Sequence, residues 1–353
     1  MKKAMNKNIL YIVITIVMFS CKSRDLETPI SFQNPSNFPE PHYNLSQNPI
    51  TTEGFKLGKM LFFDSILSRD GTISCGNCHI PSSAFTHHGH DLSHGIDDQL
   101  TLRNAPPIMN LAWQKEFFWD GGVFDLDLFA LAPIEAHNEM DESIANVLNK
   151  LRKHPTYPKM FERAFGTSEI TLDRFLKALS QFQLMAISAN SKYDKYIRNE
   201  GATLTNDELA GLEIFKAKCS SCHQGELFTD LSYRNNGIIP QRFKLNGVDT
   251  IDTGRERITL NPNDKFKFKV PSLRNVEITR PYMHNGSLRT LEQVLDHYQT
   301  GVKDNPTLDP ILKQNGRLGI ALTDDEKKKI IAFLKTLTDE EFLKNPILSE
   351  ENP

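Results

Sequence analysis

Apolar residues recur every three or four positions over most of the chain. The clearest run places Phe175, Leu179 and Phe182 on one face of a predicted helix. Thr171 stands at the start of this run, where a helix cap is expected. Strict alternation of apolar and polar residues, which is typical of half-buried strands, occurs only in short pieces. The pattern therefore predicts an all-α fold with long loops.

Capping residues mark further helix starts. Three Thr residues are followed three positions later by Glu or Gln, which is the spacing of a capping box: Thr205 with Glu208, Thr290 with Gln293, and Thr323 with Glu326. A further helix carries the apolar residues Ile144, Val147, Leu148 and Leu151, and we expect Asp141 to cap it.

Two stretches of the chain share one order, which is an apolar helix, a Cys motif and a loop. Residues 54–63 precede Cys75, residues 211–215 precede Cys219, and the dipeptide Phe-Thr follows both motifs. The second unit begins near Gly201. We therefore predict two domains, residues 51–200 and residues 201–340, and a tail at residues 341–353.

The first 20 residues have the composition of an export signal. A basic start is followed at residues 9–19 by an apolar run that is too short to span a bilayer. The run ends in Met-Phe-Ser-Cys at residues 18–21, which resembles a bacterial lipobox. Cys21 would then be acylated and become the first residue of the mature protein. The alternative is an ordinary signal peptide in which this Cys occurs by chance.

Residues 21–50 contain many Pro, Ser and Asn residues, and they predict a tether between the anchor and the folded body. Acyl chains on Cys21 would hold the protein at a membrane surface. We therefore expect an exported protein of the cell envelope, either periplasmic or anchored to the outer membrane. Its membrane contact would be through the lipid anchor only.

Composition narrows the choice of partners. Hydrophobic residues make up 39% of the chain and Phe occurs 22 times, which suits packed cores. The 41 Lys and Arg residues are balanced by 44 Asp and Glu residues. Nucleic-acid binding needs clustered positive charge, so we exclude it. A basic partner protein fits better.

The four Cys residues after Cys21 form two copies of one motif. Cys75, Cys78 and His79 make the first Cys-x-x-Cys-His, and Cys219, Cys222 and His223 make the second. This motif is the attachment site of a c-type haem. The two thiols lie on one face of a turn, where they can reach both vinyl groups of one porphyrin, and the following imidazole can reach the iron. The sequence therefore predicts two covalently bound haem c groups, one in each domain.

Other uses of these Cys residues explain less. A zinc site would place the two Cys pairs about 15–20 residues apart, and Cys78 and Cys219 are much farther apart. A thioredoxin-like pair needs no His after it, and its βαβ context is missing. Two disulfides are an option in an oxidising compartment, but they do not explain a His at the same offset twice.

On these motifs and their surroundings, the chain resembles the bacterial di-haem cytochrome c peroxidase and MauG family over nearly all of residues 51–340. The matching segments are LGKMLFFD (57–64), TISC (72–75), AFT (84–86), RNAP (103–106), FWDG (118–121), EM (139–140), VPSLRNV (270–276) and PYMHNG (281–286). The resemblance implies that the first haem reacts with peroxide and that the second accepts electrons from a small donor protein.

The resemblance also implies two catalytic residues. Trp119 matches the tryptophan that relays electrons between the haems, and its alternative is an ordinary buried aromatic residue. Glu139 matches the acid that moves a proton during cleavage of the O–O bond, and its alternative is a solvated Glu at a helix start. The family commonly has Gln at the place of Phe129, so this chain departs from the family pattern at that position of the pocket.

A loop rich in His follows the first motif. In reductively activated peroxidases a His of this loop caps the first haem, and that position falls here on Ile96. We therefore predict an open first haem in the resting protein, with His94 as the alternative ligand. The other His residues of this loop, His87, His88 and His90, are expected to be solvated or to form a surface metal site.

The resemblance implies further ligands in the second half. Tyr298 matches the sixth ligand of the second haem, which is Met in ordinary peroxidases and Tyr in MauG. Tyr298 also continues the apolar face of Leu291 and Leu295, so it could be a core residue, and Met283 is then the alternative ligand. A calcium ion between the haems is implied as well. Its ligands would be the side-chain oxygen of Asn104 and the carbonyl oxygens of Thr279 and Pro281.

Three functions are open at this point. The first is a cytochrome c peroxidase that reduces hydrogen peroxide to water at the haem on His79, with electrons from a cytochrome c or cupredoxin entering through the haem on His223. The second is a MauG-like oxidase that modifies a partner protein through high-valent haem iron. The third is a di-haem electron carrier without enzymatic activity. A homodimer is one option for assembly.

Overall fold

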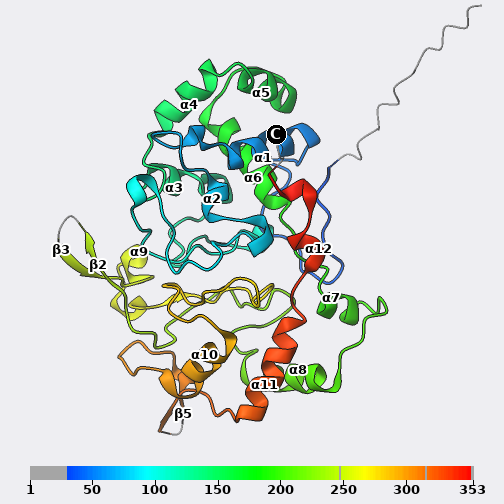
Figure 1. Cartoon of the computed structure of the whole chain (residues 1–353), viewed down its shortest axis with the longest axis vertical. Helices are drawn as coiled ribbons and strands as arrows, with labels where there is room; N and C mark the ends of the chain where they lie inside the picture. Colours follow the sequence, from blue (N-terminus) through cyan, green and yellow to red (C-terminus); the bar gives the residue numbers. More distant parts are fainter. Residues whose placement is uncertain (1–29, 246–247, 315, 351–353) are drawn as a thin grey trace, which may run out of the picture.

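The computed structural model describes residues 30–245, 248–314 and 316–350, so the predicted signal peptide and Cys21 lie outside the described residues. Twelve α-helices are present in the described part: α1 (Thr52–Phe63), α2 (Cys75–Cys78), α3 (Leu131–Glu135), α4 (Ile144–Lys153), α5 (Tyr157–Phe165), α6 (Leu172–Leu184), α7 (Lys192–Ile197), α8 (Asn206–Lys218), α9 (Glu256–Thr259), α10 (Leu291–Asp296), α11 (Asp324–Lys335) and α12 (Glu340–Leu343). Long loops join them (Figure 1).

The strands of the described part are short and form antiparallel pairs: β1 (Tyr233–Arg234) with β4 (Phe268–Lys269), β2 (Arg242–Leu245) with β3 (Val248–Ile251), and β5 (Lys313–Gln314) with β6 (Arg317–Leu318). The β2–β3 hairpin projects from the side of the molecule (Figure 1). Because the hydrophobic cores are built from helices and loops, the prediction of an all-α fold is confirmed.

Two main hydrophobic cores divide the molecule into an upper and a lower body in Figure 1. In the upper body α1 packs against α6 and α5, and in the lower body α8 packs against α11. A glycine makes each helix pair possible. A β-carbon at Gly58 would collide with the carbonyl oxygen of Ala178 on α6, and one at Gly211 would collide with that of Lys329 on α11. The backbones of the two helix pairs therefore approach closely in the same way.

The three predicted capping boxes are confirmed, because the hydroxyls of Thr205, Thr290 and Thr323 accept hydrogen bonds at the starts of α8, α10 and α11. The prediction for α4 is wrong. Ser143 caps this helix by accepting from the backbone N–H of Asn146, whereas Asp141 forms an ion pair with Arg69 at 2.5 Å.

The segment before α1 differs from the predicted tether over residues 30–50. Phe38 is buried in the first core and Phe32 packs beside it, with Trp113 between them at ring distances of 4.9 and 5.6 Å. Burial of these aromatic rings outweighs the loop-forming composition of the segment. The end of the chain also returns to the first core, where Phe342 and Leu348 are buried.

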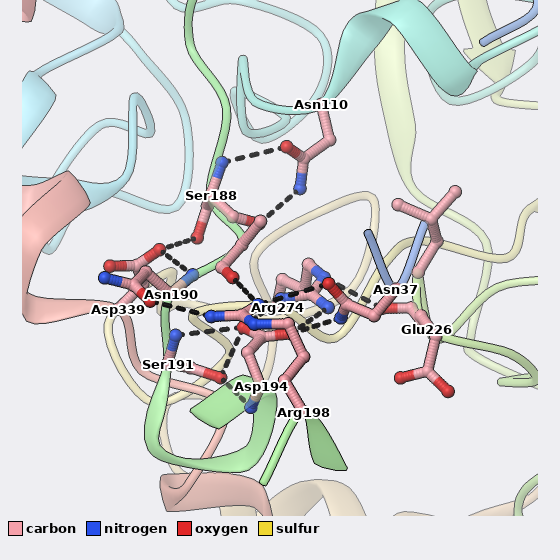
Figure 2. Close-up of polar contacts among 12 residues, drawn as sticks. Asn37, Asn110, Ser188, Asn190, Ser191, Asp194, Arg198, Glu226, Arg274 and Asp339 are labelled. Carbon is pink, nitrogen blue, oxygen red and sulfur yellow. Dashed lines mark hydrogen bonds and ion pairs between the residues drawn. The ribbon is translucent and has the colours of Figure 1, made fainter. Parts of the chain in front are cut away.

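A buried network of polar side chains joins the two bodies (Figure 2). At its centre Arg274 forms an ion pair with Asp194, and both hydrogen bonds are 2.8 Å long. Neither side chain is exposed to solvent. Asn37, from the segment before α1, donates to the same carboxylate at 2.9 Å. Because a buried charge is tolerated only when it is paired, this network fixes how three distant parts of the chain meet.

Within the described residues we find no helix with both the length and the apolar character that a membrane crossing requires.

Candidate functional site

The first Cys motif lies on the one-turn helix α2. Ser74 and Asn77 form a capping box at its start, and the backbone N–H of His79 donates to the carbonyl of Cys75 at 2.9 Å. The second motif has the same turn, since the N–H of His223 donates to the carbonyl of Cys219 at 3.0 Å. In both motifs the two Cys side chains and the following His are therefore presented by one tight turn.

All four Cys residues are unpaired and partly exposed. Burial raises the pKa of Cys75 to about 12, and it raises that of Cys219 equally to about 12. The sulfur atoms are therefore protonated thiols at neutral pH, and no disulfide competes for them. The arrangement of two free thiols on one turn fits attachment of a porphyrin in each half.

The two imidazoles are oriented in the same way. Nδ1 of His79 donates to the carbonyl of Phe85 at 2.7 Å, and Nδ1 of His223 donates to that of Phe228 at 3.1 Å. Because a carbonyl can only accept, these bonds place the ring proton on Nδ1 and leave Nε2 as the atom that can bind a metal. Burial lowers the pKa of His79 to about 4, which keeps this imidazole neutral. Both His residues therefore fit the role of an iron ligand.

Phe85 and Phe228 hold their carbonyls in place through unusual backbone angles and through packing. Their φ angles are 59° and 53°, a region that residues other than Gly rarely adopt. Phe85 packs near Phe62 at 6.0 Å, and Phe228 packs near Phe215 at 5.8 Å. The phenylalanine of each Phe-Thr dipeptide is thus a structural support for its imidazole.

Glu139 belongs to the first of the two sites. After burial, its negative charge adds to the rise in the pKa of both thiols of this motif, so the carboxylate acts on this site. Burial raises the pKa of Glu139 itself. Its carbonyl accepts from the N–H of Ile96 at 2.8 Å, and a β-carbon at Gly95 would collide with its backbone. The Gly95-Ile96 segment therefore positions this acid.

In the His-rich loop after the first motif, the sequence places Ile96 at the position of the capping His and leaves His94 as the alternative ligand. Ile96 is fully buried at the expected position. The side chain of His94 is 43% exposed, and its Nδ1 pairs with Asp98 at 2.5 Å. His87 stacks on His90 at 4.3 Å. In the described part of the chain no three His, Cys, Asp or Glu side chains are grouped so that they could hold a metal ion.

Phe129, where the sequence departs from the pattern of the family it resembles, is buried and stacks on Phe118 at 4.7 Å. An apolar ring therefore packs on the residue that precedes Trp119 in the chain.

Two candidate ligands meet one side chain at the second site. Tyr298 lies on a π-helical turn, His297–Gly301, that continues α10, and its pKa is raised by burial and by the charges of Cys222 and Cys219. Asn236 hydrogen bonds with this hydroxyl, and its Nδ2 donates to the sulfur of Met283 at 3.2 Å. Sequence reasoning did not identify Asn236. A π-helical turn often marks a functional site, so the turn that carries Tyr298 is the signal that points to Asn236 beside it.

Trp119 is held between the two bodies by backbone contacts. Its Nε1 donates to the carbonyl of Asn104 at 2.8 Å, and its own carbonyl accepts from the N–H of Lys269 at 2.7 Å. The side-chain amide of Asn104 donates to the carbonyls of His90 and Asp91, which leaves its Oδ1 available to a cation. Thr279 and Pro281 lie in the loop before Tyr282, and the calcium site stays a prediction.

Comparisons with known proteins agree with this geometry. Residues 52–202 match the family model of the di-haem cytochrome c peroxidases. The chain is 34% identical to the methylamine utilization protein MauG of Methylorubrum extorquens, over 88% of this chain and 84% of that protein. It is 36% identical to the cytochrome c551 peroxidase of Nitrosomonas europaea, over 86% of each.

Solved structures of di-haem peroxidases and MauG-like proteins are similar to this chain as well. A MauG-like protein associated with microbial copper homeostasis is 34% identical and superimposes with a TM-score of 0.79, covering 91% of this chain and 99% of that one. The di-haem peroxidase BthA of Burkholderia thailandensis, at 23% identity and a TM-score of 0.72, shares the fold over 86% of this chain and 91% of its own. This chain therefore belongs to the di-haem cytochrome c peroxidase and MauG family of peroxidase-type oxidoreductases.

Proposed function

We propose that this protein reduces hydrogen peroxide to water at the site of His79, with electrons that enter through the site of His223. The observation that carries the proposal is Glu139, a partly buried carboxyl group whose charge acts on both thiols of the first motif. Haem c groups bound through the two Cys motifs would supply an iron that coordinates peroxide and a route for electrons.

Glu139 supplies the proton transfers in this proposal. Its carboxylate takes a proton from the inner oxygen of peroxide and returns it to the outer oxygen, which then leaves as water. Burial raises the pKa of this carboxyl group, so its two protonation states lie closer together in free energy at neutral pH than those of an exposed Glu.

Access to the first site supports turnover without prior activation. Ile96 carries no ligand atom, and the side chain of His94 is 43% exposed to solvent. We infer that the resting protein keeps one axial position of the first iron open.

Trp119 is the proposed electron relay, because its indole is held by the carbonyl of Asn104 between the two bodies. A calcium ion at Asn104, Thr279 and Pro281 would stiffen this region. The donor is proposed to be a small basic cytochrome c or cupredoxin, since acidic residues outnumber basic ones in this chain, 44 to 41. Acylated Cys21 would keep the protein in the cell envelope, and a homodimer is compatible with this arrangement.

A MauG-like oxidase is the second candidate, and Tyr298 is the observation that favours it. The hydroxyl of this residue is buried, lies near Cys219 and Cys222, and hydrogen bonds with Asn236. An anionic oxygen ligand stabilises ferric iron more than the sulfur of Met283 would. In this case the oxidising equivalents would act on residues of a partner protein.

The test combines two measurements on the protein matured with its haems. Electron paramagnetic resonance of the isolated protein should show one high-spin and one low-spin ferric haem. Rapid peroxide turnover with a reduced small cytochrome supports the peroxidase, and peroxide-driven spectral change without such turnover supports the oxidase. Two low-spin haems that bind neither cyanide nor carbon monoxide would instead indicate a plain electron carrier and overturn the proposal.

A further inference from the structure

A cavity of about 190 Å³ lies beside Trp119, where the two bodies meet. Its lining includes Lys115, Glu116, Tyr233, Arg255 and Lys269. Lys269 and Tyr233 face each other across the β1–β4 pair, and the backbone N–H of Lys269 donates to the carbonyl of Trp119 at 2.7 Å. The cavity is therefore connected directly to the segment proposed to carry electrons.

Positive charge exceeds negative charge in this cavity. Glu116 is the acidic residue of the lining, and both its carboxylate oxygens are engaged by Arg255, at 2.8 and 3.1 Å. Nearby Asp120 is fully buried and is paired with Arg103 and Arg257. The Nζ atom of Lys269 donates to the backbone carbonyl of Glu116. Among the described residues, no carboxylate is in direct contact with this atom. Burial lowers the pKa of Lys269 to about 8, and the charges of Glu116 and Asp120 only partly oppose this shift.

A second donor in the cavity lacks a partner. The hydroxyl oxygen of Tyr233 is buried near the carboxylate of Glu116, which Arg255 already holds, and burial together with this carboxylate raises the pKa of the hydroxyl. No described residue meets this oxygen with hydrogen-bond geometry. The guanidinium of Arg255 covers the ring at 4.0 Å and fixes its position. Gly121 has no side chain and a φ of 71°, and a β-carbon there would collide with both this hydroxyl and Arg255. The backbone two residues after Trp119 is therefore shaped to admit these groups.

We propose that this cavity binds a carboxylate group, which accepts hydrogen bonds from the Tyr233 hydroxyl and the Lys269 ammonium. A carboxylate has two acceptor oxygens in one plane, so one group can serve both donors. Its charge would add to those of Glu116 and Asp120 in offsetting the burial of the ammonium. The source is either a propionate of a bound haem or a small free carboxylate. The inference goes beyond peroxide reduction and does not depend on turnover.

The experiment uses the protein with its haems and three variants, Tyr233→Phe, Lys269→Met and the control Lys153→Met. Lys153 is an exposed residue at the end of α4. Sodium acetate is titrated into each protein by calorimetry, with sodium chloride as the control for ionic strength. The midpoint potentials of both haems and the propionate vibrations in the resonance Raman spectrum are measured on the same samples.

If the carboxylate is free, acetate binds to the wild type and to Lys153→Met, and affinity falls at least about tenfold in Tyr233→Phe and in Lys269→Met. If it is a haem propionate, acetate does not bind, but both variants shift the propionate vibration and lower the midpoint potential of one haem. The potential falls because a nearby cation or hydrogen-bond donor stabilises the reduced form. Tyr233→Phe removes one oxygen atom and keeps the test valid if Lys269→Met does not fold.

The proposal is overturned if acetate binds no better than chloride and if neither variant changes a potential or a propionate vibration. Because none of these readouts needs peroxide, failure of the peroxidase proposal would leave this result interpretable.

Discussion

In each half of the molecule three phenylalanine rings pack together, and one of these residues carries the carbonyl that accepts from the imidazole. In the first half the rings of Phe62 and Phe182 are 4.9 Å apart, and those of Phe85 and Phe182 are 6.2 Å apart. In the second half the corresponding distances are 5.1 Å between Phe215 and Phe333 and 6.1 Å between Phe228 and Phe333. The support behind the two imidazoles is therefore the same within a few tenths of an ångström.

The surroundings of the two sites differ far more than this support. The first site faces the apolar Ile96 and the acid Glu139. The second site faces Tyr298 and Met283, both of which contact Asn236. The same kind of packing therefore orients the imidazole in each half. The residues on the opposite side of each imidazole are what distinguish a site for chemistry from a site for electron transfer.

The loops that follow the two Cys motifs are also attached to the rest of the molecule in different ways. The second loop is held across the body interface, because Nε of Arg274 donates to the carbonyl of Glu226 at 2.8 Å while its other nitrogens pair with Asp194. The first loop is instead covered by the end of the chain, where Phe342 lies 5.9 Å from Phe85. An ion pair secures one site and an aromatic contact secures the other.

The largest effect is expected from Arg274→Met, which removes the ion pair with Asp194 and the hydrogen bond that holds the second loop. Removing one partner of a buried ion pair should lower the free energy of unfolding by about 3–5 kcal/mol, because the carboxylate of Asp194 is left buried and unpaired. Urea denaturation followed by circular dichroism measures the change.

Arg289→Met is the matched control, since Arg289 pairs with Asp91 at 3.3 Å on the surface, where an ion pair contributes little. Adding Asp194→Leu to Arg274→Met should recover part of the loss, because no unpaired charge is then left. Equal small losses in Arg274→Met and Arg289→Met would show that the buried pair does not secure the second loop.

Glu139→Gln tests the chemical difference between the sites. We expect peroxide turnover to fall by about 10²-fold or more, since a proton-transferring side chain contributes at least this much. Steady-state kinetics with a reduced small cytochrome measures the change. Glu135→Gln, an exposed residue on α3, should keep wild-type activity.

The pH dependence sharpens this test. Burial raises the pKa of Glu139, so its carboxylate form is lost at a higher pH than that of an ordinary Glu as the solution is acidified. The acid limb of the pH profile of kcat/KM should therefore have its midpoint above about 4.3, the usual pKa of a Glu side chain. An unchanged acid limb in Glu139→Gln would assign the titration to another group.

Gly58→Ala and Gly211→Ala test the similarity of the two halves. Each substitution pushes a β-carbon into a carbonyl of the partner helix, and we expect each to cost about 1–3 kcal/mol of stability. Thermal unfolding measures both. Glu213→Ala, whose side chain is 71% exposed on α8, should have little effect. If only one glycine variant is destabilised, the halves do not use the same close helix packing.

The smallest effect is expected from Tyr298→Met, which exchanges an oxygen ligand for a sulfur ligand at the second site alone. The midpoint potential of the second haem should rise, because a thioether stabilises ferric iron less than an anionic oxygen does. Redox titration followed by visible spectra measures both haems. Tyr282→Phe removes a hydroxyl that bonds only to the carbonyl of Val276 at 2.9 Å, and it should leave both potentials unchanged. An equal shift of both haems would argue against Tyr298 as a ligand.

Local patterns predicted much of this molecule. The caps at Thr205, Thr290 and Thr323 were expected, since a capping box is made within four consecutive residues. Ser143 was missed as the cap of α4 because Asp141 is an equally good capping residue, and only its contact with Arg69 shows that it is engaged elsewhere.

The sequence alone determined the two Cys motifs, the helical class and the apolar faces of the helices. These features depend on residues a few positions apart, so their spacing is sufficient to identify them. Tertiary structure decided that residues 30–50 pack on the first core, that Asn236 meets both Tyr298 and Met283, and that Arg274 pairs with Asp194. These contacts join residues far apart in the chain, and their free energy comes from burial and charge pairing, which no local pattern records.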